Sequence, residues 1–362
     1  MPKAITLRRA GNYHHLNLKD VPQPVAKPNE VLLKVVTAAL NHRDLYIRQS
    51  LYPSISFDNA ILADGCALVL PHPKGAAASH SFLPDQRVII NPGTGWISDP
   101  AGPEGAYAVI GGTSATKLGM LQEMLAVPAA DVQLAPPHLS NAEAAALPLA
   151  GLTAWRAFRT KSSNAAPGRN ILVTGIGGGV AIMVLLFARA MGCNVFVTSS
   201  STAKIERALE LGAQGGVDYT DEDKWPLTLR NMLPKDRPFL DAVIDGAGGD
   251  ILGNTWKLLK NGGVVVSYGM TSLSQPAMPM QAVMKNIELR GSTMGSQQEF
   301  GEMVRFVSEK KIRPVVDRVV TDMNNLDAID GLFEDLRKGM QFGKLVVEIE
   351  GVRKPHQHQG KL

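Results

Sequence analysis

A short glycine-rich segment carries the clearest chemical signal in this chain. The apolar residues 171–173 run into the glycine-rich segment 175–179, and an apolar helical run, 182–191, follows directly. Glycines let a backbone approach a pyrophosphate, and the N-terminus of the next helix offers unpaired N–H groups and a positive dipole end. Because strand, turn and helix follow in this order, the segment favours a dinucleotide site over the alternative, a tight turn inside some other α/β fold.

The residues after the second expected strand, 194–198, bear on the choice between a ribose 2′-hydroxyl and a 2′-phosphate. Enzymes that use NAD usually place a carboxylate there, whereas this chain has a run of hydroxyl side chains, 198–202, followed by Lys204. Hydroxyls can donate to phosphate oxygens, and lysine can supply the charge, so the pattern favours NADPH over NADH. In the compatible alternative, Ser201 or Thr202 caps the next helix and Lys204 is solvated.

The elements that must position these groups divide the chain in two. The first third reads as short strands punctuated by prolines, with one helical stretch at 41–48. After the glycine turn, strands and helices alternate, which predicts a doubly wound parallel sheet with its ligand at the carboxyl ends of the strands. Further strands are expected at 241–245, 263–268 and 286–290, helices at 203–211 and 299–310, and a return to strand, helix and strand from residue 314 to 349.

Composition narrows the function classes. The formal net charge of the 362 residues is +4, and the basic residues are scattered, which argues against a nucleic-acid footprint. No apolar run reaches membrane-spanning length, and no signal peptide precedes the first strand-like run. Cys66 and Cys193 lie in apolar surroundings, so we expect a reducing, cytoplasmic compartment without disulfides. Residues 351–362 are polar and predict a frayed tail.

The order of these motifs resembles the medium-chain dehydrogenase/reductase superfamily. Residues 38–48 look like its first active-site helix, 147–155 are similar to its hinge helix, and 173–181 are similar to its nucleotide turn. The resemblance implies an α/β protein with a GroES-like β-rich domain and a Rossmann domain. We expect the GroES-like catalytic domain at 1–135 and 313–362, and the NADP-binding domain at 136–312. The resemblance also implies a homodimer joined through the last Rossmann strand, 286–290, which would protect an open strand edge.

Within the superfamily, the chain most resembles the zinc-free quinone oxidoreductase-like branch. Zinc-dependent alcohol dehydrogenases take thiolate ligands from positions that here are Asn41 and Leu149, and a histidine ligand from a segment that here is 62–65. These residues are not zinc ligands, and the cysteines of the structural zinc loop are missing from 91–112. We therefore expect no metal site.

The resemblance and the residues together predict the chemistry. A hydride added to the β-carbon of an enone or a quinone leaves negative charge on oxygen, which hydrogen-bond donors stabilise before a proton arrives. The candidates on helix 41–48 are Asn41, Asp44 and Tyr46. Asn41 and Asp44 also fit an N-cap pair, and both interpretations can hold. His42 could donate a proton, but a lone histidine beside an arginine is more often at the surface.

The expected function is therefore zinc-independent, NADPH-dependent reduction of quinones or α,β-unsaturated carbonyls. The alternatives are a ketone or secondary-alcohol oxidoreductase and an NADPH-binding protein without catalysis. In the resembled branch, a lysine and a tyrosine at the positions of Lys204 and Tyr219 serve NADPH. The residues expected to bind NADP are Thr153, Gly177, Gly178, Gly179, Val180, Ser199, Ser200, Lys204, Tyr219, Gly246, Ala247, Tyr268, Gly269 and Met270.

Overall fold

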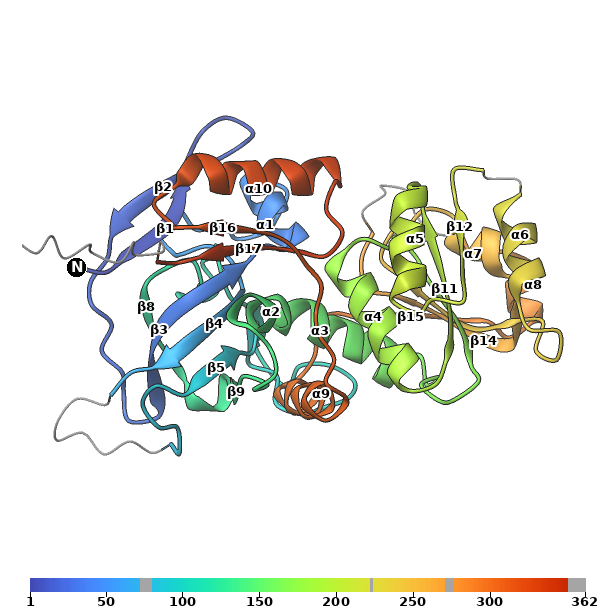
Figure 1. The fold of residues 1–362 in the computed structure, drawn as a ribbon, viewed down its shortest axis with the longest axis horizontal. Coiled ribbons are helices and arrows are strands. Elements are labelled where there is room, and N and C mark those ends of the chain that lie inside the picture. The colour runs from blue at the N-terminus through green and yellow to red at the C-terminus, as the bar shows by residue number, and fades with distance from the viewer. Residues whose placement is uncertain (72–79, 222–223, 271–276, 351–362) are drawn as a thin grey trace, which may run out of the picture.

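The computed structural model describes residues 1–71, 80–221, 224–270 and 277–350, and the expected tail at 351–362 lies outside these ranges. The chain forms two lobes, with helices α2, α3 and α9 between them (Figure 1). None of the helices in the described ranges has both the length and the apolar character needed to cross a bilayer. The two cysteines are buried and unpaired with each other.

The first lobe is built on a mixed sheet whose described strands run in the order β16-β17-β3-β4-β5-β9, with β8 also pairing with β3. Strand β17 is antiparallel to β3, so the C-terminal strands belong to this lobe. The exact domain boundaries expected at residues 135 and 313 stay a prediction. The strands are β3 (Glu30–Ala39), β4 (Asp64–Val69), β5 (Arg87–Ile90), β8 (Met124–Pro128), β9 (Val132–Leu134), β16 (Val316–Thr321) and β17 (Lys344–Glu348).

Smaller elements complete this lobe. A hairpin and a short strand pair lie outside the main sheet, and two helices pack against each other. These elements are β1 (Lys3–Arg8), β2 (His15–Asp20), β6 (Gly93–Thr94), β7 (Ala108–Val109), α1 (His42–Arg48) and α10 (Leu326–Lys338). A 3₁₀ turn, Ala129–Asp131, links β8 to β9.

The second lobe holds a parallel sheet in the order β12-β11-β10-β13-β14-β15, which confirms the doubly wound fold expected from the sequence. The chain order reverses between β10 and β13, where such sheets bind ligands. The strands are β10 (Asn170–Val173), β11 (Asn194–Ser199), β12 (Gly215–Asp218), β13 (Leu240–Asp245), β14 (Leu259–Ser267) and β15 (Glu288–Gly291).

Helices cover both faces of this sheet. Helices α4 and α5 pack on one face, and α6, α7 and α8 pack on the other. The helices are α2 (Asn141–Ala146), α3 (Pro148–Trp155), α4 (Gly179–Ala190), α5 (Thr202–Glu210), α6 (Trp225–Met232), α7 (Ile251–Thr255), α8 (Met280–Met284) and α9 (Gln297–Lys310). A π-helical segment, Arg156–Lys161, extends α3.

Strand β14 differs from its expected bounds. It begins at Leu259 and not at residue 263, because Leu259 pairs with Leu240 while Val264 pairs with Ala242. The intervening residues, which include two glycines, form an irregularity in the ladder. Because adjacent glycines are typical of a turn, the sequence predicts a strand only after them.

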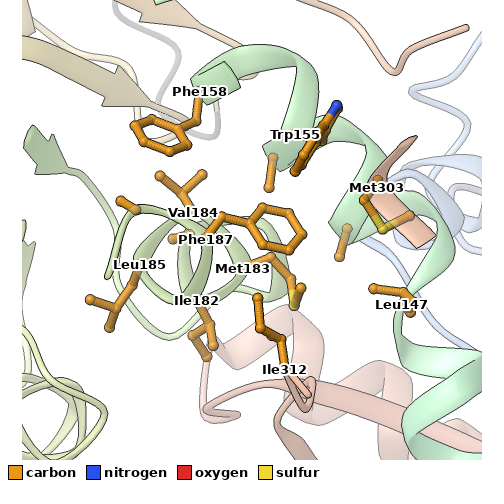
Figure 2. Packing of buried hydrophobic residues seen from close by; sticks show 14 of the residues in the cluster. Leu147, Trp155, Phe158, Ile182, Met183, Val184, Leu185, Phe187, Met303 and Ile312 are labelled. Carbon is orange, nitrogen blue, oxygen red and sulfur yellow. The ribbon is translucent and has the colours of Figure 1, made fainter. Parts of the chain in front are cut away.

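One continuous core holds the two lobes together. Figure 2 shows Trp155 and Phe187 packing where α3 meets α4, with Met303 of α9 beside them. The ring centroids of Trp155 and Phe187 lie 5.6 Å apart in an edge-to-face arrangement, which adds about 0.5–1.5 kcal/mol to the burial of their area. The same buried cluster includes Ala39 and Cys66 of the first lobe. The glycine turn before α4 is therefore anchored to both lobes.

Candidate active site

A cavity of about 540 Å³ is lined by residues of both lobes. Its walls include the carboxyl ends of β10 and β11, the start of α4, and helix α1. The structure brings together in this lining every residue expected to bind NADP, together with Asn41 and Tyr46, whereas Asp44 is not part of it. Whether these residues act as expected stays a prediction.

The glycine turn leaves its end of the cavity open to phosphate groups. Gly177 has a φ of +122°, which L side chains rarely adopt, so the backbone requires glycine, and a Cβ atom there would also displace the Lys204 side chain, whose Cδ would lie 2.8 Å away. Helix α4 begins at Gly179, and its N-cap, Gly178, has no side chain to satisfy the first N–H groups. These groups are therefore available to an anion.

The hydroxyl run ends β11 beside this turn. Ser199 is buried and Ser200 is exposed. Ser201 Oγ accepts from Lys204 N at 3.4 Å and caps α5, so the capping role weighed in the sequence is present. The cap uses the backbone N–H of Lys204, while its Nζ atom donates to Gly339 O at 2.6 Å and its side chain lines the cavity.

The described lining of the cavity holds basic side chains and no carboxylate. His42, Arg43, Lys204 and Lys344 line the cavity, and its described lining contains no aspartate or glutamate. Tyr219, with 43% of its surface exposed, also lines the cavity. A polyanion therefore meets only neutral or positive side chains here.

Helix α1 presents Asn41 and Tyr46 to the cavity, while Asp44 serves as a cap behind them. Asp44 Oδ2 accepts from the backbone N of Asn41 at 2.8 Å, and the carboxylate is 2% exposed. Burial raises the pKa of Asp44 to about 6 despite the neighbouring Arg43 guanidinium. The geometry thus shows the N-cap role, and it places this carboxylate outside the lining where a substrate would lie.

His42 is exposed, as the sequence predicts, and it also lines the cavity. The surrounding protein atoms partly desolvate the ring, and together with the positive charges of Lys344 and Lys204 this lowers its pKa. Its ring centroid lies 6.4 Å from that of Tyr46, as expected for residues four apart on one helix face. The four-residue spacing of His42 and Tyr46 is the sequence signal that could have placed His42 beside the cavity. The neighbouring wall includes the apolar side chains of Val109, Leu149 and Met294.

Lys344 is the functional candidate that the sequence did not reveal. Its Nζ atom donates to Leu40 O at 2.6 Å, Asn41 Oδ1 at 2.6 Å and Asp64 Oδ2 at 2.9 Å. The side chain of Lys344 is 5% exposed and that of Asp64 is fully buried. A lysine that opens an apolar strand is a weak local signal, because its acceptors come from distant parts of the chain.

The same cluster tests whether the site fits a zinc ion. Asp64 Oδ1 accepts from Leu149 N at 2.8 Å, and Asp64 Oδ2 accepts from both Asn41 Nδ2 and Lys344 Nζ. Both carboxylate oxygens are engaged, and an ammonium group stands against one of them. Within the described ranges, no group of three or more His, Cys, Asp or Glu side chains is placed to hold a metal. The donor set therefore does not fit catalytic zinc.

Comparisons with known proteins agree with this architecture. Residues 27–137 match the alcohol dehydrogenase GroES-like domain, and residues 179–309 match the zinc-binding dehydrogenase family. The zinc-type alcohol dehydrogenase-like protein YogA of Leptosphaeria maculans is 52% identical over 358 residues, covering 96% of this chain and 100% of the relative. A zinc-type alcohol dehydrogenase-like protein of Schizosaccharomyces pombe is 31% identical, covering 91% of this chain and 94% of the relative.

A solved structure gives the same result. The crystal structure of an NAD-dependent alcohol dehydrogenase is 30% identical, covers 96% of this chain and 100% of its own, and superimposes with a TM-score of 0.82. Both family models and the full-length relatives support the resemblance drawn from the motifs. The chain therefore belongs to the medium-chain dehydrogenase/reductase superfamily of oxidoreductases.

Proposed function

We propose that this protein is an NADPH-dependent oxidoreductase that reduces quinones or α,β-unsaturated carbonyl compounds by hydride transfer without zinc. The observation that carries the proposal is the single cavity that joins the glycine turn to Asn41 and Tyr46, with basic side chains and no carboxylate in its described lining. The relatives named as zinc-type proteins would suggest a metal, but the donor set around Asp64 does not fit one.

The cofactor preference rests on this chain's own residues. One solved relative is NAD-dependent, and enzymes of that kind usually accept the ribose hydroxyls with a carboxylate at the end of the second strand. Here β11 ends in Ser199 and Ser200, and Lys204 lines the same part of the cavity. Hydroxyl donors and an ammonium match a 2′-phosphate and offer no acceptor of that kind to a ribose hydroxyl.

At the other end of the cavity, side chains at the start of α1 would stabilise the negative charge that develops on the substrate and complete the reduction. The hydride would come from NADPH held in this cavity. The Asn41 amide, which lines the cavity, would donate to the acceptor oxygen on which negative charge develops. The Tyr46 hydroxyl, or a water beside it, supplies the proton that completes the reduction. Val109, Leu149 and Met294 provide an apolar wall that suits a conjugated substrate and excludes water from it.

A panel assay tests this proposal. We expect NADPH absorbance to fall when quinones, enals or enones are added, with hydroquinone or saturated carbonyl as the product. Cofactor binding without turnover of any quinone, enal, enone, ketone or aldehyde would contradict catalysis and support a binding protein.

A second candidate, a ketone or secondary-alcohol oxidoreductase, is favoured by the alcohol dehydrogenase names of the relatives. Product analysis separates the two, because an enone then yields an allylic alcohol with its C=C bond intact.

A further inference from the structure

The Lys344 ammonium is a fixed charge and not a proton donor. An ammonium group has three N–H bonds, and Lys344 uses them on Leu40 O, Asn41 Oδ1 and Asp64 Oδ2. No hydrogen remains for a substrate. Three oxygen atoms around one buried cation, one of them from a carboxylate, resemble the surroundings of a bound metal ion more than those of a surface ion pair.

The route of the lysine side chain places this charge at the junction of the two lobes. A Cβ atom on Gly179 would lie 2.8 Å from Cδ of Lys344, so the stem runs directly against the start of α4. Next to it, Gly343 N donates to Gly177 O at 2.9 Å. The ammonium therefore sits between the glycine turn and helix α1, held from both sides.

The charge acts on the amide of Asn41. Because Asn41 Oδ1 accepts from the ammonium and Nδ2 donates to Asp64 Oδ2 at 2.9 Å, a flipped amide would face two like partners and is disfavoured. The second hydrogen on Nδ2 has no protein acceptor among the described residues, and Asn41 lines the cavity. A cation on the amide oxygen draws electron density from the nitrogen, which strengthens that remaining N–H as a donor.

We propose that the Lys344 ammonium takes the place of a metal cation in this site, as a positioning residue that fixes and polarises the Asn41 amide toward the acceptor oxygen. The inference rests on the proposed reduction of a conjugated carbonyl. Asn41 touches the substrate, whereas Lys344 and Asp64 act through it. Loss of such a supporting group is expected to lower kcat roughly 10- to 100-fold.

Chemical rescue tests the role of the charge. Lys344→Ala removes three methylene groups and the ammonium, which the propylammonium ion can replace through the cavity. We expect the variant to have a lower Tm and, at saturating NADPH, a lower kcat, with the Kd for NADPH measured by cofactor fluorescence to set the saturating concentration. Propylammonium should restore both Tm and kcat, whereas propanol, which has the same chain without the charge, should restore neither.

A double variant distinguishes the effect of the ammonium charge on kcat from its effect on the stability of the fold. Lys344→Met with Asp64→Asn replaces the ion pair by neutral groups of similar size, which proteins often tolerate. We expect the double variant to fold with a higher Tm than Lys344→Ala, which leaves the buried Asp64 charge unpaired, and to show the same loss of kcat as Lys344→Ala. Lys310→Ala, at the exposed end of α9, is the matched control and should leave both unchanged.

Two outcomes would overturn the inference. Wild-type kcat in the folded double variant would show that the charge is not used, and rescue of Tm without kcat would show a structural role alone. If the wild type reduces no acceptor, the proposed function fails, and the Tm titration with propylammonium against propanol still decides whether the site requires a cation.

Discussion

The Nζ atom of Lys344 lies 2.9 Å from Oδ2 of Asp64, and the two residues are 280 positions apart in the chain. Both side chains are buried, so neither charge has water as an alternative partner. Breaking such a pair from one side leaves an uncompensated charge and costs about 3–5 kcal/mol, much more than an exposed pair contributes. The pair therefore ties the last strand of the first lobe to the wall of the cavity.

Metal content is a direct consequence of this arrangement. Because an ammonium group already neutralises Asp64, and Asn41 and Leu149 offer no thiolate, we expect well below one zinc ion per purified chain. Elemental analysis measures this, and incubation with a chelator should leave turnover unchanged. Stoichiometric zinc whose removal abolishes turnover would contradict the expectation.

The pH dependence of stability should report the buried Asp44 carboxyl. Its pKa is raised to about 6 in the fold, against an ordinary value of 3.8. The folded state thus binds this proton more tightly, so the contribution of Asp44 to stability is fully present below about pH 4 and is lost as the pH rises through about 6. Asp44→Asn keeps an acceptor for the Asn41 N–H but cannot titrate.

Denaturant unfolding of both proteins between pH 4 and 7 measures this contribution. We expect the stability of the wild type relative to Asp44→Asn to decrease across this range. A difference that stays constant with pH, or that grows as the pH rises, would be inconsistent with a raised pKa for this carboxyl.

Sequence alone reveals the parts of the site that depend on local patterns, and it does not reveal contacts between distant parts of the chain. The glycine turn and its helix are signalled within residues 171–191, because a strand, a turn and a helix start are local patterns. Asp44 has two local interpretations, and only its burial separates the cap from a cavity-facing acid. Lys344 lies 303 positions from Asn41, so no local spacing connects them, and their contact depends on β17 joining β3.

The outer edge of the second sheet predicts an oligomer. Strand β15 is the last strand in the order, and α8 beside it exposes Met280 and Met284 by 69% and 76%. An open strand edge next to exposed methionines suits pairing with the same edge of a second copy. We expect a dimer in light scattering at micromolar concentration.

Met284→Asp should shift this dimer toward monomer, since a buried charge opposes association. Leu227→Asp is the control, because Leu227 is 61% exposed on α6, away from this edge, and the same new charge there should not change the mass. A wild type that remains monomeric would refute the paired edge.

The side chain of Lys204 is expected to set the preference for NADPH over NADH. A 2′-phosphate carries nearly two negative charges, and a partly exposed lysine beside it contributes on the order of 1–2 kcal/mol. Since NADH lacks that phosphate, Lys204→Ala should weaken NADPH binding roughly tenfold and leave NADH nearly unchanged. Tyr219→Phe should act in the same direction but less strongly, because it removes a hydroxyl from the same part of the cavity.

The contact that Lys204 makes with Gly339 O supplies the competing explanation. If the lysine only joins α5 to the segment after α10, its loss should lower the affinity for both cofactors equally through a less stable fold. Titrating NADPH and NADH against the wild type, Lys204→Ala and the surface variant Lys310→Ala separates the two cases. An NADPH-to-NADH affinity ratio in Lys204→Ala equal to that of the wild type would show that Lys204 does not recognise the 2′-phosphate, whatever happens to the Tm.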